Sequence, residues 1–154
     1  MPCIVRWPGK VKPGAVVDEP ICHTHLLATS AAIVGAKLPD TAGEDSFSIL
    51  PLLLGEKREV PTHEAVVHQA ANGTLAIRQG KWKLVFLFEK DKQALELYDL
   101  SADLGETKNL AAAQPDVVQR LTRLMQKYID DGRSTPGTKQ SNDVEVPLLA
   151  SPAN

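Results

Sequence analysis

Histidine and cysteine side chains offer the most versatile chemistry in this sequence, as nucleophiles, proton carriers and metal ligands. They are Cys3, Cys22, His23, His25, His63 and His68. Cys22, His23 and His25 are close enough in sequence to bind a soft metal together, but no second pair of ligands follows to complete a tetrahedral site. We therefore predict no metal site in this chain. Two cysteines are too few for a disulfide framework, and they fit either a single pair or two small buried side chains.

His63 and His68 flank a predicted strand. Because side chains alternate between the two faces of a strand, histidines at positions i and i+5 point to opposite sides. A metal site shared by both is therefore excluded. His68 is the better candidate for a binding role, since it ends the strand just before the Asn72-Gly73 hairpin signal. A histidine on an edge strand without a binding role is the alternative.

The charged residues further along the chain suggest two other kinds of site. Asp99, Asp103 and Glu106 resemble a calcium loop, but their spacing lacks the alternation of an EF-hand. Carboxylates that cap a turn are the simpler interpretation. Basic side chains near the predicted hairpins either guide an anionic substrate or form a solvated sheet face. These are Arg78, Lys81 and Lys83.

The elements that must position these residues fall into two regions. In the first, residues 2–7 form an apolar run that predicts a buried strand, and residues 23–36 have the apolar pattern of a mostly buried helix. Residues 46–55 predict a short helical turn that Pro51 keeps from growing longer. A charged stretch follows, and we place the boundary between the two regions after Glu56.

The second region has the pattern of an antiparallel sheet followed by a helix. Short apolar runs separated by turn signals predict four strands. They cover residues 65–68, 74–78, 82–88 and 95–98. Residues 115–131 predict a helix that begins at a proline and carries an apolar stripe suited to cover the sheet. Residues 138–154 are rich in small and polar side chains and predict a flexible tail.

The overall composition is that of a globular protein. Of the 154 residues, 43% are hydrophobic and 23% are charged. The formal net charge of −2, without a basic face or stripe, argues against a nucleic-acid partner. No apolar run approaches the roughly 18 residues that span a bilayer, so no membrane span is predicted.

Four stretches of the chain resemble the C-terminal part of type I sulfatases, the arylsulfatase-like enzymes of the alkaline phosphatase superfamily. They are residues 2–11 (PCIVRWPGKV), 45–55 (DSFSILPLLLG), 76–84 (AIRQGKWKL) and 96–110 (ELYDLSADLGETKNL). Each stretch alone is a weak signal. Together they follow the family's order and spacing, which makes the resemblance specific.

The resemblance implies an α/β fold of which this chain holds one end, α+β when taken by itself. Residues 1–56 would be the remnant of the large sulfatase α/β domain, residues 57–137 a C-terminal subdomain of four antiparallel strands packed by a helix, and residues 138–154 the tail. The chain departs from the family at the first helix, where His25 replaces an aspartate and Ala28 a proline. That aspartate is interpreted as a local cap, so the change concerns stability more than chemistry.

Sulfatases of this family use a formylglycine, made from Cys or Ser in a Cys/Ser-x-Pro/Ala-x-Arg motif, and a calcium ion held by Asp and Asn. The resemblance implies both groups for a full-length parent only. Cys3 precedes Ile4-Val5-Arg6 and Cys22 precedes His23-Thr24-His25, so neither is a formylglycine precursor. We therefore predict no catalytic residue and no cofactor in this chain, and no sulfatase activity of the chain alone. Met1 would be an internal methionine or the edge of a longer polypeptide.

For the parent, the resemblance implies a sulfated carbohydrate or an aryl sulfate as substrate, and a periplasmic or secreted location. In related enzymes the C-terminal subdomain lends side chains to the rim of the substrate pocket, and His68 is our candidate for such a substrate contact. The chain itself would form a wall of that pocket, and its uncovered apolar surface would lead to self-association. A stand-alone, non-catalytic binding module of the same fold is the alternative.

Overall fold

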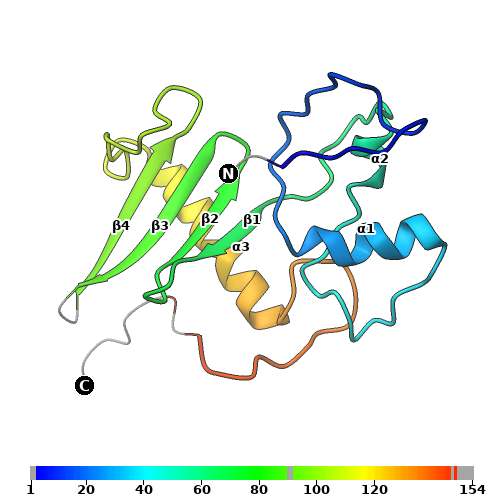
Figure 1. Cartoon of the computed structure of the whole chain (residues 1–154). Coiled ribbons are helices and arrows are strands. Elements are labelled where there is room, and N and C mark those ends of the chain that lie inside the picture. The colour runs from blue at the N-terminus through cyan, green and yellow to red at the C-terminus, as the bar shows by residue number, and fades with distance from the viewer. Residues whose placement is uncertain (1–2, 90–91, 147, 149–154) are drawn as a thin grey trace. The chain divides into compact units, whose positions relative to one another are not determined.

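The structure, a computed structural model, describes residues 3–89, 92–146 and 148. The chain folds as two compact units. Unit 1 comprises Met1–Glu64 and Thr135–Gly137, and unit 2 comprises Ala65–Ser134 and Thr138–Asn154. Figure 1 labels the helices and strands of both units.

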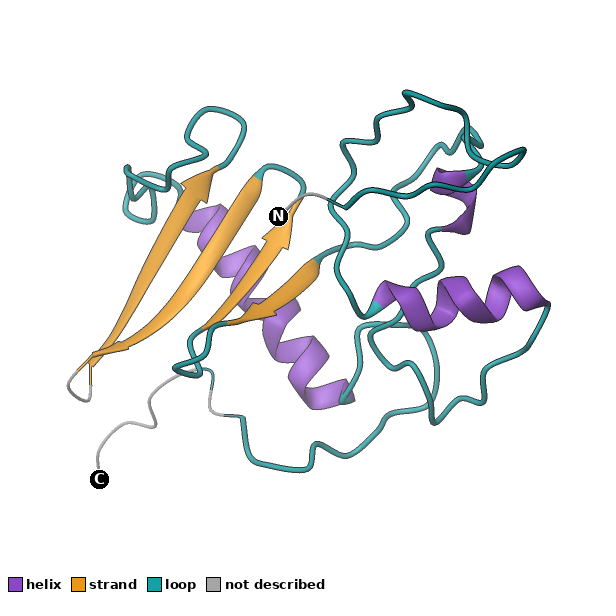
Figure 2. Ribbon diagram, in the orientation of Figure 1, coloured by secondary structure: helices purple, strands orange, loops and turns teal. Residues whose placement is uncertain are grey.

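Unit 2 is a four-stranded antiparallel sheet with one helix. Its strands are β1 (Val66–Gln69), β2 (Leu75–Gln79), β3 (Trp82–Glu89) and β4 (Lys92–Asp99), and its helix is α3 (Pro115–Asp131). Each strand pairs with the next one along the chain, in the order β1-β2-β3-β4. α3 packs against one face of this sheet (Figure 2). The predicted α+β architecture of four antiparallel strands and a C-terminal helix is confirmed.

The core of unit 2 lies between α3 and the sheet. Ile77, Leu84 and Leu97 are aligned across β2, β3 and β4, and all three are completely buried. α3 covers them with the apolar stripe that the sequence predicts. The buried members of the stripe are Leu121, Leu124, Met125 and Tyr128. Burial of one such side chain contributes about 2 kcal/mol, so this layer is a major source of the stability of unit 2.

Asn109 ties the loop after β4 back to the sheet. Its Oδ1 accepts hydrogen bonds from the backbone N–H groups of Leu97 and Ala111, at 3.1 and 2.8 Å, and its Nδ2 donates to the Leu95 carbonyl at 3.2 Å. β4 is an edge strand, so some of its backbone N–H and C=O groups have no neighbouring strand to bond to. The side-chain amide of Asn109 forms hydrogen bonds with these groups instead.

Unit 1 consists of loops around two helices, α1 (His25–Val34) and α2 (Leu50–Leu53). Hydroxyl groups join these loops and helices. The Thr29 hydroxyl accepts a hydrogen bond from the Ile49 backbone N–H at 3.0 Å. The Ser46 hydroxyl accepts from the Ala28 backbone N–H at 2.8 Å and donates to the Thr24 carbonyl at 2.6 Å, so it bridges two backbone groups at the start of α1. Buried polar side chains thus hold much of unit 1 together.

Two expectations for unit 1 are wrong. Residues 3–7 form no strand, and Ile4 is 90% exposed, because none of the described residues provides a neighbouring strand for them. α1 is not mostly buried, since Leu26 and Val34 are 55% and 77% exposed. A helix that is apolar all round needs cover on every side, and its sequence does not reveal whether the same chain supplies that cover.

The boundary between the two units lies after residue 64. The charged stretch in the sequence predicts a boundary after residue 56. Residues 57–64 belong to unit 1 because two hydrogen bonds hold them there. The Thr62 backbone N–H donates to the Glu19 carboxylate, and the His63 ring donates to the Pro20 carbonyl at 2.6 Å. Hydrogen bonds between residues this far apart in the chain cannot be predicted from the local sequence pattern.

Part of the predicted tail lies against the end of α3. The Gln140 backbone N–H donates to the Asp131 carbonyl at 2.9 Å. Gly132, at a φ of 60°, permits this approach, because a Cβ at that position would collide with the Gln140 carbonyl oxygen. Residues 147 and 149–154 of the predicted tail lie outside the described residues.

Candidate functional site

The sheet of unit 2 has an outer face, opposite α3, that carries the predicted binding residue His68. Directly paired residues of neighbouring strands point to the same side of a sheet. Ile77 and Leu84, which pair with each other, point into the core. The positions on either side of them therefore form the outer face. In one row these are His68, Ala76, Val85 and Glu96, and in the next Val66, Arg78, Lys83 and Tyr98.

His68 lies on the edge strand β1, where part of its ring is covered and the rest is exposed. Partial burial of its ring, followed by the positive charges of Lys83 and Arg78, lowers the pKa of His68 below its ordinary value of 6.5, and Glu106 opposes this shift. At neutral pH the imidazole is therefore uncharged, with one donor nitrogen and one acceptor nitrogen. Such a ring suits a sugar hydroxyl, or a sulfate oxygen that accepts from its N–H.

Two of the three basic residues near the hairpins are neutralised by carboxylates. Lys81 Nζ lies 2.6 Å from an oxygen of Asp99, and Lys83 Nζ lies 2.6 Å from an oxygen of Glu106. Arg78 has no carboxylate partner among the residues that the structure describes. An anion bound at the outer face would therefore meet the positive charge of Arg78 and the neutral ring of His68.

The carboxylates that resemble a calcium loop already have partners in the folded chain. Asp103 accepts hydrogen bonds from the backbone N–H groups of Thr107 and Lys108 at 2.8 and 2.9 Å. These bonds lower the pKa of Asp103, and the bond from Lys108 contributes most. Glu106 adopts a left-handed backbone, at a φ of 53°, and its carboxylate binds Lys83. The interpretation of these residues as a capped turn is confirmed.

The remaining candidates do not assemble into a site. Within the described residues, no group of three His, Cys, Asp or Glu side chains could hold a metal ion. Cys22, His23 and His25 do not act together, since His25 is buried and His23 is exposed. Thiol and imidazole donors do not suit calcium, which prefers oxygen ligands, and no reaction step is assigned to these residues. No described helix is both long and apolar enough to cross a membrane.

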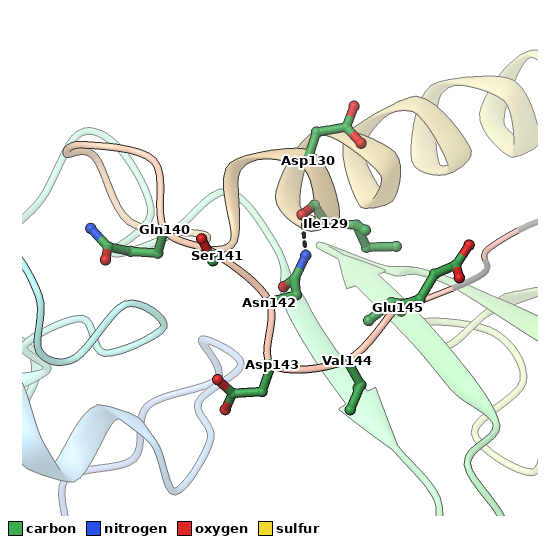
Figure 3. Close-up of a pocket in the computed structure, with 9 residues that line it drawn as sticks. Ile129, Asp130, Gln140, Ser141, Asn142, Asp143, Val144 and Glu145 are labelled. Carbon is green, nitrogen blue, oxygen red and sulfur yellow. Dashed lines mark hydrogen bonds between the residues drawn. The ribbon is translucent and has the colours of Figure 1, made fainter.

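A shallow pocket of about 470 Å³ lies beside the C-terminal end of α3 (Figure 3). Three carboxylates line it, those of Asp130, Asp143 and Glu145, and they point in different directions. Asn142 Nδ2 donates to the Ile129 carbonyl at 2.7 Å and holds the lining loop to the helix. The lining includes no cation, so like charges would repel a sulfate ester there. The outer face remains the better candidate site.

Sequence reasoning missed the contribution of Tyr98 to the outer face. The Tyr98 hydroxyl donates a hydrogen bond to the Glu96 carboxylate at 2.8 Å. Burial, followed by this hydrogen bond, raises the pKa of Tyr98 to about 12. The alternation of side chains along residues 96–98 is the signal that places both residues on one face.

Comparison with known proteins identifies the family. Residues 1–134 match the family model described as N-sulphoglucosamine sulphohydrolase, C-terminal. The N-acetylgalactosamine-6-O-sulfatase of Bacteroides thetaiotaomicron is 36% identical over 140 residues, which cover 82% of this chain and 26% of that protein. A structure solved in work on glycosaminoglycan metabolism by Bacteroides thetaiotaomicron is 35% identical, with a TM-score of 0.67 over 80% of this chain and 28% of that one.

More distant relatives share the fold. A protein solved in complex with its substrate D-glucosamine-2-N,6-O-disulfate is 20% identical, with a TM-score of 0.53 over 67% of this chain and 22% of that one. The present chain spans about a quarter of the length of the curated relatives it matches, at 26% of each of the first two. The sheet, the helix and the family match all agree with the four sequence stretches. This chain belongs to the sulfatases of the alkaline phosphatase superfamily, and it matches their C-terminal domain.

Proposed function

We propose that this chain is the non-catalytic C-terminal part of a sulfatase whose complete polypeptide hydrolyses sulfate esters of a carbohydrate. The observation that carries the proposal is the match of residues 1–134 to a C-terminal sulfatase domain. The chain also covers only 26% of a relative that is named N-acetylgalactosamine-6-O-sulfatase. An aryl sulfate is the second class of substrate. The name arylsulfatase K, carried by a relative from Danio rerio, supports keeping that class in the tests.

The chemistry of such an enzyme would lie outside these residues. The resemblance implies that a formylglycine would supply the nucleophile there and that a calcium ion would neutralise the sulfate oxygens. Cys3 and Cys22 lack the motif that formylglycine requires. Asp103 is already bonded within its own loop, and Glu106 is paired with Lys83 of β3. The role left to the chain is to complete the fold and to form one wall of the substrate pocket.

Within that wall, His68 is the proposed substrate contact. Its exposure on β1 makes the ring accessible. Its lowered pKa keeps the ring uncharged at neutral pH, so it binds a hydroxyl or a sulfate oxygen without the cost of desolvating a charge. Arg78 lies on the same face and adds a positive charge, which strengthens a hydrogen bond to an anionic ligand.

The first test concerns activity and gene context. Purified chain, assayed with an aryl sulfate and a 6-sulfated N-acetylgalactosamine in the presence of calcium, should show no turnover. The gene sequence upstream of the Met1 codon should continue in frame and encode a Cys/Ser-x-Pro/Ala-x-Arg motif. Hydrolysis that depends on this polypeptide alone would contradict the proposal. A stop codon close upstream would favour a stand-alone binding module.

The second test concerns His68 in the complete enzyme. His68→Ala should raise KM for the sulfated saccharide by about tenfold, the effect of losing one or two hydrogen bonds, and leave kcat unchanged. His68→Gln keeps a donor and an acceptor and should recover part of the loss. His23→Ala, at an exposed histidine of unit 1, is the matched control. Equal KM values for His68→Ala and the unmodified enzyme would remove His68 from the pocket.

A further inference from the structure

Two buried histidines from distant parts of the sequence lie against each other in unit 1. The ring centroids of His25, the first residue of α1, and His63 are 4.9 Å apart. Only 2% of His25 and 7% of His63 is exposed. The ring of Phe47 lies 6.0 Å from the first and 5.8 Å from the second. A positive charge is costly in such a place, because it leaves water without gaining an anionic partner of its own.

Hydrogen bonds fix which nitrogen of each ring carries the proton. A carbonyl oxygen only accepts, so His63 Nε2, 2.6 Å from the Pro20 carbonyl, must be the donor. The Cys22 backbone N–H donates to Nδ1 of His25 across 3.4 Å. Neutral His25 therefore carries its proton on Nε2. A second proton enters His25 at Nδ1 only, where it removes the acceptor for the Cys22 N–H.

The surroundings of His25 do not stabilise that second proton. The titratable groups around it are His63, Glu19 and the Cys22 thiol, and the thiol lies 2.7 Å from the Thr24 hydroxyl. α1 has no acidic side chain in its first turn. The Glu19 carboxylate already accepts from the Thr62 backbone N–H. Burial, followed by the charge of His63, lowers the pKa of His25 below 6.5, and Glu19 opposes the shift.

We propose that the His25–His63 pair is an acid-sensitive latch in unit 1. While His25 is neutral, the pair holds residues 19–22 and residues 62–63 against the start of α1, and proton uptake at His25 Nδ1 releases these segments. Because the unfolded chain takes up this proton more readily than the folded one, the stability that the latch gives is complete above pH 6.5. It is lost as the pH falls through the lower pKa of the folded state.

The latch can be tested by amide hydrogen exchange on the full 154-residue chain at pH 7.5 and pH 5.5, corrected for intrinsic rates. Protection of amides in residues 22–30 should fall severalfold in acid, because the folded state loses the stability of the latch as the pH falls through the lowered pKa of His25. Amides of β2 and β3 should keep their protection. Equal losses in both regions would mean global acid unfolding and would overturn the latch.

Three substitutions separate titration from packing. In His25→Asn the side-chain oxygen can still accept from the Cys22 N–H, and in His63→Gln the amide can still donate to the Pro20 carbonyl, but neither residue titrates. His25→Asn should retain its protection at pH 5.5. His23→Asn, at the exposed neighbour, should lose protection as the unmodified chain does. Acid sensitivity that persists in His25→Asn would overturn the proposal.

A second measurement decides the matter if the variants do not fold. In the unmodified chain, the ring resonances of His25 should titrate with a midpoint below 6.5, and the amide resonances of Cys22 and Thr62 should shift with the same midpoint. A midpoint at or above 6.5, or amide resonances that do not follow it, would show that the pair is no latch.

Discussion

Units 1 and 2 differ in what fills their interiors. Unit 2 buries Ile77, Phe86 and Leu121 completely in one apolar layer between sheet and helix. Unit 1 buries polar side chains, such as Thr29 and Ser46 and the histidine pair, and leaves apolar residues of α1 exposed. The apolar residues of unit 2 thus pack together into a core. Most of the described apolar residues of unit 1 do not belong to such a core. The two units therefore differ in the kind of side chain that they bury.

The largest expected effect comes from opening a cavity in the core of unit 2. Leu97→Ala should lower the free energy of unfolding by about 2–5 kcal/mol, because Leu97 is completely buried. Leu26→Ala, at an exposed position of α1, should change it by no more than about 0.5 kcal/mol. Urea unfolding followed by the fluorescence of Trp7 in unit 1 and Trp82 in unit 2 measures both. Equal effects at the two positions would show that the units do not differ in this way.

A smaller effect should come from Asn109. Asn109→Ala removes the acceptor for two backbone N–H groups and should cost about 1–3 kcal/mol. Lys127→Ala, which breaks an exposed ion pair of α3, should cost only about 0.5 kcal/mol. Thermal unfolding of the two variants beside the unmodified chain gives the ranking. If Lys127→Ala proves the more harmful, the loop after β4 is not fixed by Asn109.

Self-association of the chain should depend on the exposed apolar side chains of unit 1. The isolated chain is expected to self-associate through exposed apolar side chains such as Leu26 and Val34. The double variant Leu26→Lys, Val34→Glu should reduce light scattering severalfold at equal concentration. Val144→Lys, at an exposed apolar residue of unit 2, is the control and should leave scattering unchanged. A clean monomer in the unmodified chain would contradict the expectation.

The smallest effect concerns Tyr98 on the outer face. Its pKa of about 12 means that the folded protein keeps the phenolic proton longer than the unfolded chain does. The stability from this group is therefore complete below pH 10 and falls as the pH rises through 12. Glu96→Gln should lower the pKa of Tyr98 towards 10, which ultraviolet titration of the tyrosinate band measures. An unchanged titration would leave burial as the only cause.

The sheet and its helix were predictable because their signals are local. The bounds of α3, Pro115–Asp131, agree with the prediction, since a proline marks the start, a glycine follows the end, and an apolar stripe runs between them. β4 is longer than its apolar stretch suggests and begins at Lys92. Pairing with β3, rather than hydrophobicity, extends it.

The candidate sites were predictable only in part. Alternation along β1 places His68 on one face, but the neutralisation of Lys83 by Glu106 depends on a left-handed residue in a loop. The contact of His25 with His63 joins two segments that are far apart in sequence. Propensity and periodicity describe neighbours along the chain, so such a contact has no signature in them.

The order of the strands has a consequence for how the molecule forms. Because every strand of the sheet pairs with its immediate predecessor, no pairing has to wait for a distant stretch of polypeptide, and such local topologies cross a low entropic barrier. Residues 65–131 can therefore begin to fold without waiting for contacts from distant parts of the chain, and Leu148 joins their core afterwards.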